Sequence, residues 1–136
     1  MKKGFTLLEL IVVIIVLGIL ASIAVPKYFE VVERGRTAEA VSILGLVRSS
    51  QMRHYAEKTT FVGGDCSNLD VGYTGTKFYK MACTAAADAD EANDIATATR
   101  DGSKVPIPTG FDAYVLTIKI NGNIGCTGTG CTKLGY

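Results

Sequence analysis

The fold is decided by the first 28 residues, Met1–Tyr28, which read MKKGFTLLELIVVIIVLGILASIAVPKY. Residues 10–25 carry no charge, whereas the rest of the chain is polar and rich in glycine and threonine. The 21 residues from Phe5 to Val25 would form a helix of about 32 Å, long enough to cross a bilayer. Lys2 and Lys3 precede this run and favour a cytoplasmic N-terminus with the C-terminal body outside.

Two common kinds of apolar segment fit this run only in part. A secretory signal peptide has an apolar stretch of about 7–15 residues followed by a cleavage site of small residues. The apolar run here is longer and continues into a helical pattern. A plain membrane anchor fits the length, but it does not need Glu9, an acid inside the apolar run. Ionisable groups in membrane helices usually have a partner and a function, although simple hydration near the interface is the competing interpretation.

The combination of residues in this segment resembles the N-terminus of type IV prepilins and of the related pseudopilins. The shared features are Lys2-Lys3-Gly4-Phe5-Thr6-Leu7-Leu8-Glu9, an apolar run that contains Gly18, and Pro26-Lys27-Tyr28. This resemblance implies cleavage after Gly4 by a membrane prepilin peptidase, N-methylation of the new N-terminal Phe5, and a role for Glu9 in filament assembly. It also implies an inner-membrane precursor with a single membrane pass and its C-terminus outside. Inner-membrane assembly machinery would then build identical subunits into an extracellular helical pilus.

Electrostatics agrees with the implied role of Glu9. Cleavage after Gly4 would leave an α-amine on Phe5 at the start of a membrane helix, where the helix dipole disfavours a cation. Glu9 lies about one helical turn further along. If the Glu9 carboxylate of one subunit meets the Phe5 amine of the next, each charge neutralises the other. We therefore expect Glu9 to set the register between subunits.

A helical pattern continues beyond the apolar run and predicts one long helix from about Phe5 to about Glu57. Apolar residues recur near helical spacing between charged ones, so we expect the second half to be amphipathic and to pack on its own domain. Pro26 removes a backbone donor and is expected to kink or loosen the helix. The apolar positions are Val41, Leu44, Val47, Met52 and Tyr55. The expected segments are a leader at 1–4, a membrane and filament-core helix at 5–26, its amphipathic continuation at 27–57, and a head at 58–136.

The head is predicted to contain a small antiparallel sheet. Gly63-Gly64-Asp65 is expected to end the helical region, and Asn121-Gly122 is a strong signal for a two-residue hairpin turn. The candidate strands are Phe78–Ala82, Ile95–Thr99, Ala113–Ile120 and Asn123–Cys126. The predicted fold class is thus α+β, a long N-terminal helix packed on a small antiparallel sheet head.

The four cysteines all lie in the head, and an even number in an exported domain predicts two disulfides. Four cysteines allow three pairing schemes. Cys66–Cys83 with Cys126–Cys131 is favoured. The first bond would tie the segment after the helix to the first strand, and the second would close a Thr-Gly-Thr-Gly loop. A zinc site is disfavoured because zinc ligands usually come in closer pairs than these.

No catalytic, cofactor or metal site is predicted. The net charge of +1 argues against nucleic-acid binding, and the single histidine, His54, is most simply a surface or interface residue. The oxygen-rich stretch Asp88–Asp94 is a candidate calcium site, but its spacing is not that of an EF-hand loop, so a solvated loop is preferred.

The predicted function is that of a structural subunit, the major pilin of a type IV pilus, rather than an enzyme. A major pseudopilin of type II secretion is the first alternative, because its stem would look the same and the acidic stretch mildly favours it. A minor tip pilin with an adhesive or DNA-binding role is the second. The paired cysteines and the Gly/Thr-rich C-terminus favour a pilin exposed to shear, while the biological task, whether motility, cell adhesion, DNA uptake or secretion, stays open.

Overall fold

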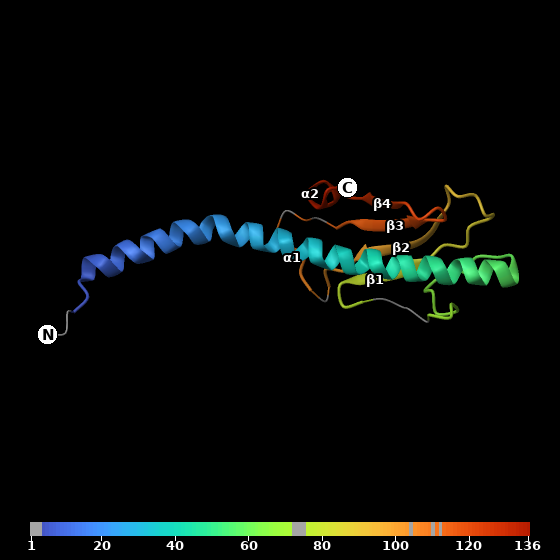
Figure 1. Cartoon of the computed structure of the whole chain (residues 1–136), viewed down its shortest axis with the longest axis horizontal. Coiled ribbons are helices and arrows are strands. Elements are labelled where there is room, and N and C mark those ends of the chain that lie inside the picture. Colours follow the sequence, from blue (N-terminus) through green and yellow to red (C-terminus); the bar gives the residue numbers. More distant parts are fainter. Residues whose placement is uncertain (1–3, 72–75, 104, 110, 112) are drawn as a thin grey trace.

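The computed structural model describes residues 4–71, 76–103, 105–109, 111 and 113–136, so the predicted roles of Lys2 and Lys3 lie outside the described residues. One long helix, α1, is followed by four strands and one short helix (Figure 1). About half of α1 projects alone, and the other half lies along the sheet. The element bounds are α1 Leu7–Lys58, β1 Tyr79–Cys83, β2 Asp94–Arg100, β3 Val115–Lys119, β4 Ile124–Thr127 and α2 Cys131–Leu134.

Local side-chain and backbone geometry explains both ends of α1. Thr6 is the N-cap, which places the first helical residue two positions after the predicted start at Phe5. At the other end Thr59 takes a left-handed conformation with φ 55°, and its N–H bonds to the Tyr55 carbonyl. The helix therefore ends at Lys58, one residue past the predicted end near Glu57, and Gly63-Gly64-Asp65 lie beyond it. Pro26 lies inside the continuous helix, and Figure 1 shows the projecting half gently curved.

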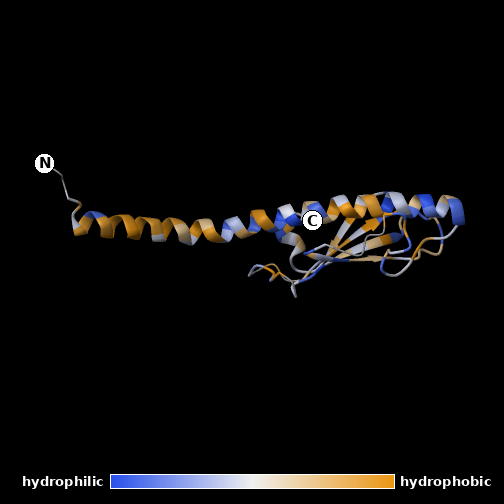
Figure 2. Cartoon of the chain, turned by 90° about the horizontal axis from the view of Figure 1, so that it is seen from below, coloured by the Kyte–Doolittle hydropathy of each residue, from blue (hydrophilic) through white to orange (hydrophobic). Residues whose placement is uncertain are grey.

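The projecting half and the packed half of α1 differ in how their side chains are covered. The apolar N-terminal part of the helix is long enough to cross a membrane, has a mean hydropathy of 3.0 and has none of its residues buried. Figure 2 shows this half hydrophobic on all sides, whereas the packed half alternates between hydrophobic and hydrophilic residues. The buried residues of the packed half follow one another at intervals of three and four, apart from one adjacent pair: Glu33, Thr37, Ala40, Leu44, Val47, Ser50 and Gln51.

The predicted apolar stripe was only partly right. Leu44 and Val47 are buried, but Val41, Met52 and Tyr55 are only half-buried against the core. Polar residues, among them Glu33 and Gln51, take the remaining buried positions of the helix face. The stripe is thus longer and more polar than the apolar pattern indicated.

The sheet is antiparallel, and its strands lie side by side in chain order, β1-β2-β3-β4. All four predicted strands exist with shifted ends, and β2 is a central strand and the longest. Side chains alternate along β1 and β3, so that Tyr79 and Met81 of β1 and Leu116 and Ile118 of β3 are buried. These residues meet the packed half of α1, and the core therefore lies between one helix and one sheet face.

The turn between β3 and β4 is one residue longer than predicted. The Lys119 carbonyl accepts from the Gly122 N–H at 2.9 Å, and the Lys119 N–H donates to the Asn123 carbonyl at 3.0 Å. Lys119 and Asn123 thus flank a three-residue loop rather than the expected two-residue one. Gly122 has φ +93°, the left-handed conformation that this type of loop requires at its third position.

Candidate functional site

The N-terminal end of α1 is closed by a reciprocal capping box between Thr6 and Glu9. The Glu9 Oε2 atom accepts from the Thr6 backbone N–H and from the Thr6 hydroxyl, both at 2.9 Å. In return the Glu9 N–H donates to the Thr6 hydroxyl oxygen at 3.2 Å. Among the described residues, both hydrogen bonds to this carboxylate fall on Oε2.

Gly4 and Phe5 lie before the helix and are open to their surroundings. A Cβ built on Gly4 would meet no atom within 4 Å, and the Phe5 side chain is 86% exposed. The bond between them is therefore exposed. A cut at this bond would also leave the capping box whole, because Thr6 and Glu9 both stay in the mature chain.

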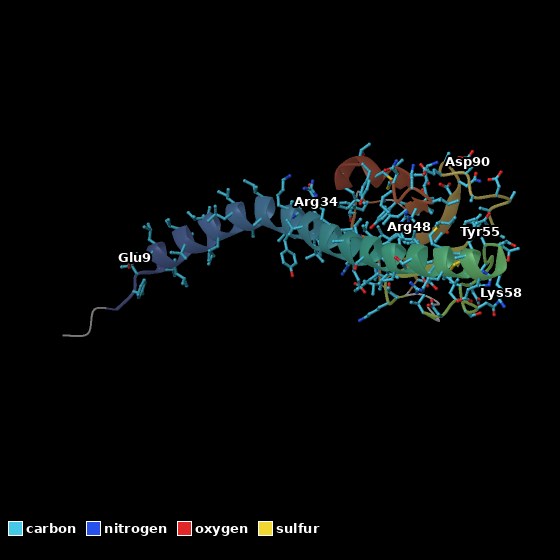
Figure 3. All side chains as sticks on the ribbon, turned by 45° about the vertical axis from the view of Figure 1, so that its right-hand side comes forward. Glu9, Arg34, Arg48, Tyr55, Lys58 and Asp90 are labelled. Atoms are coloured by element: carbon cyan, nitrogen blue, oxygen red, sulfur yellow. A yellow bond between two sulfur atoms is a disulfide. The ribbon has the colours of Figure 1, made fainter. Side chains whose placement is uncertain are left out.

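The projecting N-terminal half of α1, called the stem from here on, presents a continuous apolar surface that no part of the described chain covers. Figure 3 shows Glu9 at the far end of this stem, well away from Asp90 in the head and from the residues labelled further along α1. Exposed apolar surface of this extent is rare on soluble monomers and marks a membrane or protein interface. Its large exposed side chains include Leu7, Leu8, Leu10, Ile14, Ile15, Leu17, Ile19, Leu20 and Ile23.

A buried ion pair joins the base of the stem to the head. Arg100 of β2 donates from Nε to Glu33 Oε1 of α1 at 2.5 Å, and both side chains are fully buried. Arg36 bonds to the other carboxylate oxygen at 2.9 Å, and the Tyr114 hydroxyl donates to Oε1 at 3.0 Å. Burial alone would raise the pKa of the Glu33 carboxyl. The hydrogen bonds and positive charge of Arg100, aided by Tyr114 and Arg36, outweigh burial and hold that pKa below its ordinary value.

Three hydroxyl groups extend this network into the core. The hydroxyls of Tyr79 and Tyr114 are 2.6 Å apart, and the Thr37 hydroxyl lies 3.1 Å from that of Tyr114. Burial raises the pKa of both tyrosines, so they stay protonated and act as donors in this network. Thr37 and Glu33 belong to α1, whereas the tyrosines belong to the sheet region, so the network fixes the helix on the sheet.

Sequence reasoning missed this network. A signal for it exists, because Glu33 and Thr37 continue the spacing of Leu44 and Val47 toward the stem and therefore had to face the sheet. The partners were not predictable in the same way. Arg100 follows Glu33 by 67 residues, and nothing in the local pattern of β2 indicates that its last side chain is buried.

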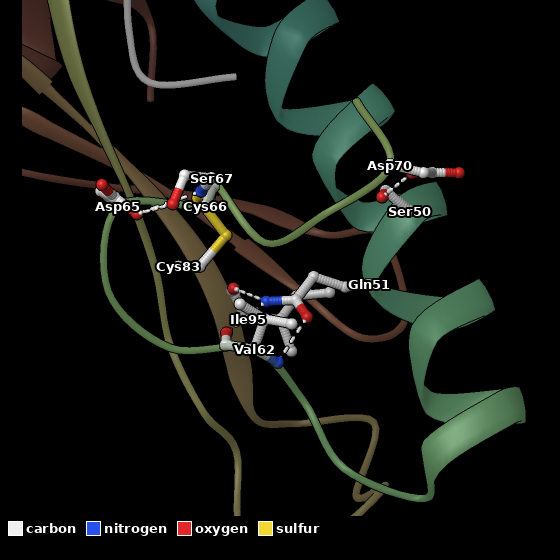
Figure 4. Close-up of a disulfide and its surroundings, with 9 residues drawn as sticks. All are labelled: Ser50, Gln51, Val62, Asp65, Cys66, Ser67, Asp70, Cys83 and Ile95. Atoms are coloured by element: carbon white, nitrogen blue, oxygen red, sulfur yellow. Dashed lines mark hydrogen bonds between the residues drawn. A yellow bond between two sulfur atoms is a disulfide. The ribbon is translucent and has the colours of Figure 1, made fainter. Parts of the chain in front are cut away.

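The structure contains the two disulfides that the sequence favoured. Cys66–Cys83 ties the segment after α1 to β1 (Figure 4). Beside it Gly64 pairs with Cys83 through two backbone hydrogen bonds. Cys126–Cys131 links β4 to α2. Within the intervening Thr-Gly-Thr-Gly loop only Gly128 has a positive φ, +115°, and an added Cβ there would lie 2.5 Å from the Ala113 carbonyl oxygen.

The acidic stretch uses its carboxylates on its own loop. Asp88 accepts from the Asp90 N–H at 3.1 Å and from the Asn93 side-chain amide at 2.7 Å. Asp94 instead pairs with Lys119 at 3.6 Å.

His54 bonds through Nδ1 to the Thr60 carbonyl at 2.8 Å. Among the residues that the structure describes, no three His, Cys, Asp or Glu side chains are grouped as a metal site would require.

Comparison with known proteins places these features in a family context. Residues 1–25 match the family described as "Prokaryotic N-terminal methylation motif". The chain is 30% identical over 132 residues to fimbrial protein EcpC of Eikenella corrodens, an alignment that covers 97% of this chain and 83% of the relative.

Other relatives carry more specific names. The chain is 33% identical over 92 residues to the type IV major fimbrial protein FimA of Dichelobacter nodosus, covering 68% of this chain and 56% of FimA. It is 28% identical over 110 residues to the type IV major pilin protein PilA of Myxococcus xanthus, covering 79% of this chain and 45% of PilA. The chain therefore spans about half the length of these two relatives. No solved structure matches significantly.

Proposed function

The chain belongs to the type IV pilin family, and from this premise we propose that it is a major pilin, the repeating subunit of an extracellular type IV pilus. Pilins are structural proteins rather than enzymes. The precursor would sit in the inner membrane through its stem with the head outside. Subunits would then leave the membrane and pack stem against stem. One observation carries the proposal: apart from Glu9 the stem up to Val25 is uncharged and largely apolar, and no described residue covers it.

Processing would occur at the open junction between Gly4 and Phe5. A prepilin peptidase is proposed to cut this bond on the cytoplasmic side and to leave Phe5 as the N-terminus, which is then N-methylated. The exposure of both residues and the match to the methylation motif support this assignment.

The Glu9 carboxylate is proposed to receive the Phe5 amine of a neighbouring subunit. Glu9 Oε2 is engaged by Thr6, so the neighbour's amine would approach Oε1. The capping box holds the carboxylate at the helix end, in position for this contact, and a charge-assisted bond in a low-dielectric filament core is strong. Pairing of this kind would set the axial step between subunits, since a shifted neighbour would leave two charges unpaired.

The major role is favoured over the minor one by the names of the relatives, since FimA and PilA are both called major subunits. The acidic stretch, which mildly favoured a pseudopilin, binds its own loop backbone and so lends that alternative no structural support. Quantitative mass spectrometry of filaments sheared from cells tests the choice. As a major pilin this chain makes up most of the filament protein, whereas a minor pilin makes up a small fraction. If deletion of the gene stops the secretion of enzymes but leaves the surface filaments in place, the chain is a pseudopilin instead.

A further inference from the structure

A groove of about 820 Å³ lies where the stem enters the head. One wall is α1, which contributes Val25 and Phe29. The other wall is the connection between β2 and β3, which contributes Ile107 and Phe111. Figures 1 and 2 both show this connection reaching along α1 beyond the sheet, toward the projecting half. The groove is therefore open to whatever runs alongside the stem.

The outer wall carries two prolines and is bonded to the arginine of the buried ion pair. Pro106 and Pro108 flank Ile107, and their rings restrict the backbone on both sides of it. Arg100, which holds Glu33, also donates from Nη1 to the carbonyls of Asp101 at 2.8 Å and Val105 at 3.3 Å. One guanidinium thus joins both walls and sets the spacing between them. An occupant would meet a groove that is already formed, so binding would cost little ordering.

The charges around the groove are engaged within the chain. Lys27 bonds to Glu30 at 3.1 Å and Arg36 to Glu33 at 2.9 Å. The Lys133 ammonium lies 5.5 Å from the centre of the Phe111 ring, within range of a cation–π contact. An anionic occupant would have to compete for these cations, whereas an apolar, uncharged one would not. The groove chemistry therefore favours an uncharged occupant.

We propose that this groove receives the stem of a second copy of the chain, through the uncharged residues 10–25. This inference rests on the proposed filament and names where its subunits meet outside the stem bundle. Residues 10–25 belong to the longest uncharged run in the sequence, and they are exposed. Val25 and Phe29 line the groove and also continue the exposed face of the stem. A neighbour that covers this face therefore runs directly into the groove.

Photo-crosslinking in assembled filaments tests the contact. Benzoylphenylalanine is placed at Ile107, and filaments are made from a mixture of ¹⁵N-labelled and unlabelled subunits, so that crosslinks between copies carry mixed isotopes. The expected product is a crosslink from position 107 to a peptide within residues 10–25 of another copy. The same probe at Leu46, which is 58% exposed and lies outside the groove, serves as the control and should not reach that peptide. Crosslinks from position 107 only to lipid, to another protein or within its own chain would overturn the proposal.

A charge variant gives an independent readout. Ile107→Lys is expected to reduce the yield of sheared filaments at least tenfold, with an unchanged melting temperature of the detergent-solubilised full chain. Leu46→Lys is the matched control and should leave the yield unchanged. Normal filament yield from Ile107→Lys would contradict the groove assignment while leaving the filament itself intact. If the unaltered chain were absent from filaments, the proposed function would fail instead, so the two failures are distinguishable.

Discussion

Glu33 and Arg100 form a fully buried ion pair across 67 residues of chain, with Oε1 and Nε 2.5 Å apart. Glu33 lies just beyond the exposed stem, and Arg100 ends the central strand β2. The pair therefore joins the exposed stem to the sheet of the head. A buried ion pair contributes little net stability but is costly to break, because removing one partner leaves the other charged and unpaired. We interpret this pair as the joint that fixes the direction of the stem relative to the head.

Breaking this joint is predicted to destabilise the head strongly. Glu33→Gln leaves Arg100 buried without its counter-charge and should lower the free energy of unfolding by about 3–5 kcal/mol. The measurement is urea unfolding of the full chain in detergent, followed by near-UV circular dichroism. The control Glu39→Gln, on the exposed face of the same helix, should change the free energy of unfolding by less than about 0.5 kcal/mol. Equal effects of the two substitutions would contradict the role given to the pair.

The same carboxyl predicts a pH dependence. The pKa of Glu33 is lowered in the folded state from its ordinary value of 4.5, so the unfolded chain takes up the proton first as pH falls. The stability difference between wild type and Glu33→Gln should thus be constant above about pH 5.5 and should shrink as the pH falls through 4.5 and below. Urea titrations from about pH 3 to pH 7 measure it. A stability difference that grows toward low pH would show that folding raises the pKa of Glu33 instead of lowering it.

The two disulfides are predicted to differ in what they contribute. They close loops of 17 and 5 residues, which the chain-entropy model converts to about 3 and about 2 kcal/mol. Replacing Cys66 and Cys83 together by serine should therefore destabilise the head more than replacing Cys126 and Cys131. Unfolding in urea without reductant gives both values. Iodoacetamide should label no cysteine in the denatured, unreduced wild-type chain, and any labelling would contradict the pairing.

Capping and charge at the N-terminus can be separated by substitution. Glu9→Gln keeps a side-chain oxygen for Thr6 but removes the charge, whereas Thr6→Ala removes the cap and keeps the charge. If charge pairing with the Phe5 amine sets the register, Glu9→Gln should abolish filaments, and Thr6→Ala should reduce their yield less. Glu9→Val should still insert into the membrane and also fail to assemble. Sheared-filament yield, normalised to the precursor in membranes, is the measurement, and normal yield from Glu9→Val would disprove a role in assembly.

Much of this architecture was predictable because it depends on local pattern. The stem is a long uncharged run, and the strands show β-branched residues bounded by turn residues, so both are visible in short windows. The end of α1 was predicted at about Glu57, one residue short of its observed end at Lys58. The cap that follows it was not predicted, because Thr59 is an uncommon residue for a left-handed conformation.

The joint between stem and head was missed for a different physical reason. Glu33, Thr37 and Gln51 are polar residues on a buried helix face, and a search for apolar periodicity passes over them. Burial is tolerable because partners outside the helix satisfy these residues. Gln51, for example, bonds to the backbone of Val62 at 2.7 and 2.9 Å and to the Ile95 carbonyl at 3.3 Å (Figure 4). Only the folded chain brings such partners together. The groove beside the joint escaped sequence reasoning for the same reason, since its walls meet only in three dimensions.

The central claim, that this chain is processed at the Gly4–Phe5 bond and built into a filament, is tested most directly by mass spectrometry of sheared filaments. The N-terminal peptide of the filament subunit should begin at Phe5 and carry one methyl group on its amine. It should be absent in cells that lack the prepilin peptidase, where the chain stays in the membrane with Met1. Filaments whose subunits begin at Met1, or at any residue other than Phe5, would contradict the account.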